Sequence, residues 1–294
     1  MTDLSKAREL PAPSAGSRLI CETPLYHLVE TRHGRFLANP NDHYIGRALI
    51  EYGEFSEREW ELLAQLAPPN AYVIEIGANI GAHTVSLAKA VGPRGHVVAF
   101  EPQPVLFQNL CANLALNGLT NVQAINAGCG EAEASLSFPR INYSQLGNFG
   151  GIPLDNLPPD PQSPFRVPVR PLDEMVDLRA LHLIKIDVEG MEAAAIRGAR
   201  GLIAAHRPLL YVENDRVEKS AELIALIESL DYRAWWHTPT YFNADNFAGR
   251  EDNIYGGVIS VNMLCAPKER PVTAPGLKPV DGSRWHPLAK LGEK

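Results

Sequence analysis

The chain has 294 residues, of which 45% are hydrophobic, enough to bury one large α/β core or two small ones. Its formal net charge is −7 and no run of Lys or Arg exceeds two residues, which argues against a nucleic-acid partner but leaves room for a local basic patch. The four cysteines are scattered and form no C-x-x-C pair, which predicts a reduced protein. The first residues are polar and no apolar stretch is long enough to span a membrane, so we expect a soluble, cytoplasmic protein without a membrane partner. None of these features indicates an oligomeric state.

The first part of the chain is predicted to be an extension of the main domain. It combines a start rich in Pro, Ala and Ser with short apolar pieces, which indicates a loosely attached segment with a small β element. A helix is predicted over 56–67, because Ser56 followed by Glu59 has the spacing of a capping box, in which each side chain bonds the other residue's backbone N–H. The predicted divisions are an extension at 1–43, the main domain at 44–268 and a C-terminal tail at 269–294.

Apolar runs then alternate with helical segments, as in a doubly wound, mostly parallel α/β sheet. Seven strands are predicted, over 72–76, 96–100, 122–126, 183–187, 209–213, 232–236 and 259–265. Helices are predicted over 84–91, 105–117, 192–205 and 221–230. Two further short strands are predicted over 136–138 and 165–169, the second at a sheet edge because Pro168 cannot donate a ladder hydrogen bond. Residues 140–164 are too long for a routine connection and are predicted to be either disordered or a functional lid.

A glycine-punctuated turn follows the first predicted strand of this sheet. It contains the pattern E-x-G-x-N-x-G, formed by Glu75, Gly77, Asn79 and Gly81. Glu101 ends the second strand, 24 positions past Gly77, where a carboxylate can accept hydrogen bonds from ribose hydroxyls. A dinucleotide fingerprint needs glycine at positions 79 and 82, which hold Asn79 and Ala82, so a nicotinamide cofactor is disfavoured. The alternative is a cofactor-free turn whose glycines serve packing.

The most distinctive polar cluster is the block Lys185–Glu192. Lys185 and Asp187 share one face of a predicted buried strand, where their burial is costly unless they pair with each other or with a ligand. Glu189 follows the strand end and can reach the cleft, although an acid at this position can also simply stabilise the start of the next helix. The block therefore indicates either a reactive site or a structural ion pair.

Taken together, these motifs resemble the FkbM family of methyltransferases. The resemblance rests on Glu75-x-Gly77-x-Asn79-x-Gly81 with Lys185-x-Asp187-x-Glu189-Gly190-x-Glu192, on Val167–Met175 and on Asn262–Pro267, and it covers 44–268. It implies a Rossmann-like class I methyltransferase fold, S-adenosyl-L-methionine as donor and an oxygen acceptor, as in enzymes that methylate hydroxyls of a macrolide immunosuppressant or of sugars. The acceptor is expected to be a small molecule or a glycan, and a non-catalytic protein that binds an adenosine cofactor is the alternative.

The resemblance also implies roles for individual residues. Gly77, Asn79 and Gly81 would shape the methionine pocket, and Glu75 would hold polar or cationic groups of the donor. Glu101 would bind the ribose, Ala127 would leave room for the adenine, and Asp187 would face the donor's amino group or the acceptor.

Methylation of an alcohol requires a group that removes its proton, either a general base or a metal ion. The candidates for the base are Asp187, supported by Lys185, together with Glu189, Glu213 and His237, which follows Trp235-Trp236 and can equally be a surface histidine beside core aromatics. His83 is expected to be structural. Catechol O-methyltransferase-like enzymes hold Mg²⁺ at similar strand ends, so Asp187, Glu213 and Asn214 are candidate metal ligands, although a metal is not favoured.

Two loops are expected to cover the acceptor. These are 140–164 and 238–256, and the alternative is that both are disordered. The second loop carries an aromatic and amide set suited to a sugar-like or polyol face, formed by Tyr241, Phe242, Asn243, Asn246 and Phe247. No stretch of the sequence identifies the acceptor itself.

Overall fold

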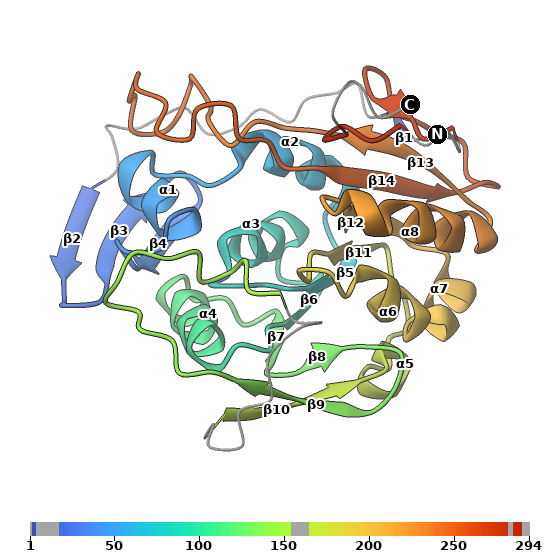
Figure 1. The fold of residues 1–294 in the computed structure, drawn as a ribbon, viewed down its shortest axis with the longest axis horizontal. Coiled ribbons are helices and arrows are strands. Elements are labelled where there is room, and N and C mark those ends of the chain that lie inside the picture. Colours follow the sequence, from blue (N-terminus) through green and yellow to red (C-terminus); the bar gives the residue numbers. More distant parts are fainter. Residues whose placement is uncertain (1, 4–17, 154–164, 282–284, 290–294) are drawn as a thin grey trace.

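The computed structural model describes residues 2–3, 18–153, 165–281 and 285–289, and an eight-stranded sheet forms its centre (Figure 1). The strands are β5 (Tyr72–Ile76), β6 (His96–Phe100), β7 (Val122–Ile125), β11 (Leu183–Ile186), β12 (Leu209–Glu213), β13 (Tyr232–His237), β14 (Asn262–Pro267) and β16 (Lys278–Pro279). Their order is β16-β13-β14-β12-β11-β5-β6-β7. The five strands from β12 to β7 are parallel, and β14 is antiparallel to both β12 and β13. The Rossmann-like α/β fold is thus confirmed, with the short β16 added to the seven predicted strands.

Helices cover both faces of this sheet. They are α1 (Ile45–Glu51), α2 (Glu57–Leu66), α3 (Ala82–Val91), α4 (Pro104–Leu116), α5 (Leu172–Met175), α6 (Glu192–Arg197), α7 (Arg200–His206) and α8 (Val217–Ser229). Apolar side chains of α2, α3 and α4 pack with one set of alternating strand residues, and those of α6, α7 and α8 pack with the other set. Lys185 alternates with Ile184 and Ile186, so it lies on the face that α2 and α3 cover.

Two predicted helices differ from the observed ones. The helix predicted over 192–205 is divided into α6 and α7 where Asp173 makes contact: its N–H donates to the Gly198 carbonyl at 3.0 Å, and its carboxylate accepts the N–H groups of Gly201 and Leu202 at the start of α7. Helix α8 begins at Val217, four residues before the predicted start. Both differences come from tertiary contacts or turn geometry that local periodicity does not report.

A small antiparallel sheet precedes the central one. It consists of β2 (Arg18–Glu22), β3 (His27–Thr31) and β4 (Gly34–Ala38), in that order. Side chains of α4 hold it in place, since Asn113 Oδ1 accepts the Leu37 N–H at 2.7 Å and Asn117 Oδ1 accepts the Arg35 N–H at 3.1 Å. These segments therefore form part of the packed structure, and the domain boundary at 43/44 stays a prediction.

A second small sheet corrects one expectation. It contains β8 (Gly128–Cys129), β9 (Ala134–Phe138) and β10 (Phe165–Arg170), and β10 lies in the middle. The prediction that this strand is an edge strand is therefore wrong. Pro168 is tolerated because β8 pairs only with Val169 and Arg170, so at Pro168 the ladder has a partner on the β9 side alone.

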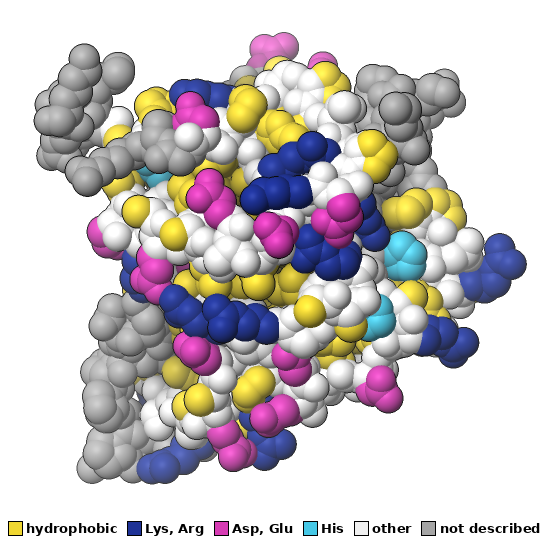
Figure 2. Space-filling view, turned by 90° about the vertical axis from the view of Figure 1, so that its right-hand side faces the viewer, with side chains coloured by type: hydrophobic (Ala, Val, Ile, Leu, Met, Phe, Trp, Pro, Cys, Tyr) yellow, Lys and Arg dark blue, Asp and Glu magenta, His cyan; other side chains and the backbone are white. Residues whose placement is uncertain are grey.

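The C-terminal segment also contacts the core. Its strand β15 (Val272–Thr273) pairs with β1 (Thr2–Asp3), and β16 pairs with β13. On the side of the molecule where α6, α7 and α8 lie, basic and acidic side chains are interspersed (Figure 2), and Arg207 Nε and Glu269 Oε1 pair at 2.8 Å.

Across the described ranges, we find no helix with the length and apolar character needed to cross a membrane.

Candidate active site

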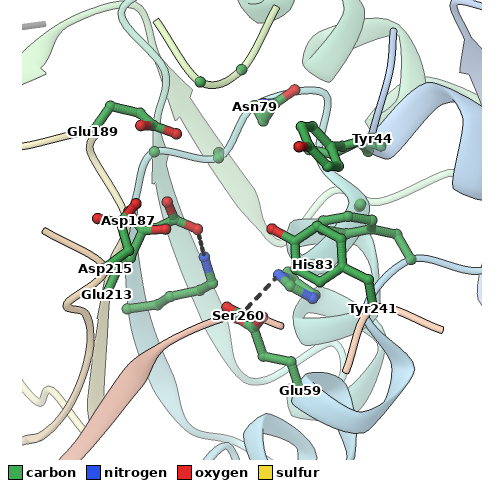
Figure 3. A pocket seen from close by; sticks show the side chains of 18 of the residues that line it. Tyr44, Glu59, Asn79, His83, Asp187, Glu189, Glu213, Asp215, Tyr241 and Ser260 are labelled. Carbon is green, nitrogen blue, oxygen red and sulfur yellow. Dashed lines mark hydrogen bonds and ion pairs between the residues drawn. The ribbon is translucent and has the colours of Figure 1, made fainter. Parts of the chain in front are cut away.

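A cavity of about 290 Å³ opens at the C-terminal ends of β5, β6, β11 and β12 (Figure 3). Open α/β sheets bind ligands at this edge. Seven carboxylate side chains line it: Glu59, Glu75, Glu101, Asp187, Glu189, Glu213 and Asp215. Among the described residues that line it, Lys185 is the one basic side chain apart from His83. The cavity is therefore strongly acidic, and it contains most of the predicted site residues.

The glycine turn brings two strand ends together. Gly77 has φ +88°, and a Cβ atom there would lie 1.7 Å from the carbonyl oxygen of Asp187, so no other residue fits this contact. Asn79 also has positive φ, at 51°, and its N–H donates to Glu101 Oε2 at 2.8 Å. The other Glu101 oxygen accepts the Gln103 N–H at 2.8 Å. Glu101 thus fixes the turn after β5 against the end of β6, with its carboxylate at the cavity.

Beneath the turn, two carboxylates surround a buried lysine. Lys185 and Glu75 are paired neighbours on β11 and β5, and Lys185 Nζ lies 2.9 Å from Asp187 Oδ2. The Thr84 hydroxyl donates to Glu75 Oε2 at 2.6 Å. Burial raises the pKa of Glu75 to about 7, against the opposing effect of Lys185. Burial alone would lower the pKa of Lys185, but Asp187 and the other nearby acids outweigh it and raise this pKa.

At the ends of β11 and β12, three carboxylates converge. Oxygens of Asp187, Glu189 and Glu213 lie within 4.8 Å of one another, an arrangement that could hold a metal ion. The predicted ligand Asn214 does not belong to this set, because its amide donates to Ser220 Oγ at 3.0 Å and lies away from the cavity. Glu189 takes its place, and its Oε2 accepts a hydrogen bond from Arg216 at 3.0 Å. Burial, reinforced by Asp187, raises the pKa of Glu189 to about 8.

Glu59, predicted to belong to a helix cap, lines the cavity instead. The capping box is wrong: neither side chain caps the helix backbone, and Ser56 Oγ instead donates to Glu59 Oε2 at 3.1 Å. The Glu59 carboxylate turns into the cavity and is 4% exposed. A signal was present, since Glu59 belongs to the apolar stripe of its helix together with Leu63 and Leu66.

His83, expected to be structural, also lines the cavity. Its Nδ1 lies 3.9 Å from Glu59 Oε1, and its buried Nε2 has no hydrogen-bond partner among the residues that the structure describes. Burial and the charge of Lys185 lower the pKa of His83 well below its ordinary value, so the imidazole is neutral near pH 7.

Two other predicted residues lie away from the cavity. His237 Nδ1 is 2.8 Å from the Tyr211 hydroxyl, which matches the alternative of a histidine beside core aromatics. Ala127 is buried in the hydrophobic core at the end of β7 and does not line the cavity.

The segment 238–256 contributes one aromatic ring to the cavity. Tyr241 lies edge-to-face with Tyr44 at 5.7 Å and with Phe55 at 5.5 Å between ring centroids, and all three rings line the cavity. Figure 3 shows Tyr44 and Tyr241 on the wall opposite the strand-end acids. The other four residues of the predicted acceptor set do not line it. Asn243, for example, donates to Glu54 Oε1 at 2.8 Å. Most of this segment therefore supports the wall from behind.

The first part of the segment 140–164 also lines the cavity. Asn148, Gly150 and Gly151 line it, and the Phe149 carbonyl accepts a hydrogen bond from Gln103 at 2.8 Å. The rest of the predicted lid, 154–164, lies outside the described residues.

Comparison with known proteins gives a family match. The family described as "Methyltransferase FkbM domain" matches residues 75–234, more than half of the chain. Methyltransferase 1 of Beauveria bassiana (strain ARSEF 2860) is 28% identical over 149 residues, which are 45% of this chain and 59% of that protein. Methyltransferase sdnD of Sordaria araneosa is 30% identical over 124 residues, 42% of this chain and 45% of that protein. The chain thus spans about half the length of these curated relatives.

Among solved structures, the chain is similar to the methyltransferase FkbM from Methylobacillus flagellatus KT. The two are 21% identical with a TM-score of 0.43, and the similarity covers 66% of this chain and 43% of that one.

Proposed function

The chain belongs to the FkbM methyltransferase family, and we propose that it transfers the methyl group of S-adenosylmethionine to a hydroxyl oxygen of a small acceptor such as a sugar or polyketide. The observation that carries this proposal is the charge of the cavity, where seven carboxylates face a single lysine. A cationic ligand relieves such an excess of negative charge, whereas the pyrophosphate of a nicotinamide cofactor would be repelled.

The residues present fit S-adenosylmethionine, which supplies an electrophilic methyl group on a sulfonium. Glu101 lies at the end of β6, where its carboxylate can accept hydrogen bonds from ribose hydroxyls besides those from Asn79 and Gln103. The turn between Gly77 and Gly81 lets the backbone approach the ligand closely. These residues bind and orient the donor in this proposal.

The acceptor hydroxyl must lose its proton, and we assign this step to a carboxylate at the end of β11. Asp187 and Glu189 are the candidates, since both line the cavity beside each other. The Nζ of Lys185, a residue that is 2% exposed, lies 2.9 Å from Asp187 Oδ2 and orients this carboxylate at the cavity. The rings of Tyr44, Phe55 and Tyr241 on the opposite wall would exclude water and orient the acceptor.

Titration calorimetry tests the donor site. S-adenosylmethionine and S-adenosylhomocysteine are expected to bind, and NAD is not. Glu101→Ala should weaken S-adenosylhomocysteine binding by roughly 1–3 kcal/mol, because it leaves buried donors unpaired. Glu228→Ala, on the exposed surface of α8, is the matched control and should bind like the wild type. Unchanged affinity in Glu101→Ala would remove this residue from the site.

Turnover with a panel of hydroxylated sugars and polyketides then distinguishes an enzyme from a protein that only binds the donor. Methyl transfer to any hydroxyl in the panel supports the proposal. Donor binding together with methylation of nitrogen or carbon acceptors alone would contradict it.

A further inference from the structure

Glu59 belongs to the cavity although it precedes the matched range 75–234. Helix α2 carries it, and the loss of the expected helix cap leaves its carboxylate directed at the cavity rather than at the helix backbone. It lies close enough to Lys185, Asp187 and Glu75 for their charges to influence one another. Glu59 therefore extends the acidic lining to the side of the cavity formed by α2 and α3.

The other two acids near Lys185 are Asp187, two residues along the chain, and Glu75, its paired neighbour on β5. Asp187 pairs with Lys185 directly, and Glu75 accepts a strong hydrogen bond from Thr84. Glu59 comes from helix α2 and, like Glu75, receives hydrogen bonds from neutral hydroxyls, here those of Ser56 and Ser260. Its nearest ionisable partner among the described residues is the imidazole of His83 at 3.9 Å, too far for a hydrogen bond. Glu59 is therefore a buried carboxylate without a cationic partner of its own.

A buried carboxylate of this kind is stabilised when a ligand supplies the cation. Burial raises the pKa of Glu59 to about 7, against the opposing effect of Lys185, so a ligand cation placed beside it would stabilise its charged form. The proposed donor offers two cationic groups. Its ammonium has three N–H donors, whereas its sulfonium has none, so a carboxylate with two acceptor oxygens matches the ammonium.

We infer that Glu59 binds the α-ammonium group of the methyl donor. This inference rests on the proposed function and adds to the donor site a residue that lies outside the family's matched range. It leaves Asp187, which is more exposed and already paired with Lys185, to act on the acceptor side.

The test is calorimetry with two ligands on two proteins. The ligands are S-adenosylhomocysteine and its analogue that lacks only the amino group, and the proteins are the wild type and Glu59→Gln. The wild type should prefer S-adenosylhomocysteine by roughly 10-fold or more, the scale of a hydrogen bond to a charged group. Glu59→Gln keeps the shape but loses the charge, so it should bind both ligands with nearly equal affinity.

Three further measurements make the result decisive. Glu59→Asp keeps a carboxylate and should retain part of the preference, which tests the inference even where the glutamine variant folds poorly. Glu101→Ala should weaken the binding of both ligands by the same factor, because both contain the ribose. Asp187→Asn should leave the preference in place.

The inference is overturned when Glu59→Gln retains the wild-type preference, or when Asp187→Asn abolishes it instead. Equal loss of affinity for both ligands in Glu59→Gln would also overturn it, by showing a role in the shape of the pocket alone. A wild type that binds neither ligand would contradict the proposed function itself, which is a different result from a wild type that binds both without preference.

Discussion

Two regions of this protein bury carboxylates to a similar extent but surround them with different partners. Glu54, 4% exposed, lies between the first small sheet and α2, and its two oxygens accept three hydrogen bonds. The donors are Arg32 Nε at 2.7 Å, Asn243 Nδ2 at 2.8 Å and the Phe247 N–H at 2.9 Å. This carboxylate joins the N-terminal segment to the segment 238–256 and is fully satisfied.

The cavity shows the opposite arrangement. Glu59 is also 4% exposed and Glu75 is 1% exposed, yet both share the field of one lysine that is already paired with Asp187. Removing one partner of a paired buried charge destabilises a fold, whereas crowded like charges destabilise it while they are present. The comparison therefore indicates that Glu54 serves the fold, whereas the cavity acids weaken it and are retained for a ligand.

The largest expected effect is on stability and comes from removing the Glu54 carboxylate. Glu54→Ala should lower the free energy of unfolding by roughly 3–5 kcal/mol, because it leaves the Arg32 guanidinium and two neutral donors buried with fewer partners. Urea denaturation of the variant measures this change, with Glu228→Ala as the surface control. A loss below about 1 kcal/mol would show that the two regions do not differ in the way described.

The next effect concerns function in the second region. Asp187→Asn preserves size but removes the charge that pairs with Lys185 and that would accept the acceptor's proton. We expect turnover to fall by roughly a hundredfold or more, the usual scale for loss of a general base, with modest destabilisation. Turnover and melting temperature are measured on the same preparation. A large fall in melting temperature with full activity per folded molecule would identify a structural ion pair instead.

The smallest effect is a pH dependence of stability without ligand. The folded-state pKa values of Glu59, Glu75 and Glu101 are raised to about 7, mainly by burial, and that of Glu189 is raised to about 8. A carboxylate whose pKa is raised by folding binds more protons in the folded state than in the unfolded state. Its contribution to the free energy of unfolding is therefore complete below the unfolded-state pKa and is lost as the pH rises through the folded-state pKa. The melting temperature should therefore fall between pH 7 and 8.5.

Glu59→Gln should make this fall shallower, and Glu228→Gln should not change it. Above pH 7, His83 does not contribute to this pH dependence, because its imidazole is neutral in both the folded and the unfolded state. A melting temperature that rises over this window would contradict the proposed crowding of the cavity acids.

The central sheet could be predicted because buried parallel strands read as continuous apolar runs between glycine turns. The strand-end rule then placed Glu75, Glu101, Asp187 and Glu189 at one cavity, as the structure does. The division between α6 and α7 could not be predicted, because it involves hydrogen bonds with Asp173, which is distant in sequence.

Some predicted site residues lie away from the cavity for similar reasons. His237 ends its strand as the other candidates do, but the antiparallel β14 lies between β13 and β12 and moves this end away from the cavity. Asn214 follows β12 directly, yet its amide faces Ser220. Glu59 was assigned to a local motif, and the direction of its side chain depends on the cavity rather than on the helix. Sequence position thus predicts the edge of the sheet better than the orientation of a side chain.

The wall formed by Tyr44, Phe55 and Tyr241 has an evolutionary consequence. Two of these rings precede the matched range 75–234 and the third follows it, so the wall is inherited on different stretches of chain from the strand ends that it faces. Substitutions can accumulate in those flanking stretches without altering Gly77, Glu101 or the strands. In the proposed function this wall orients the acceptor, so exchanging the flanking stretches between two such proteins should exchange the acceptor preference and leave donor binding unchanged.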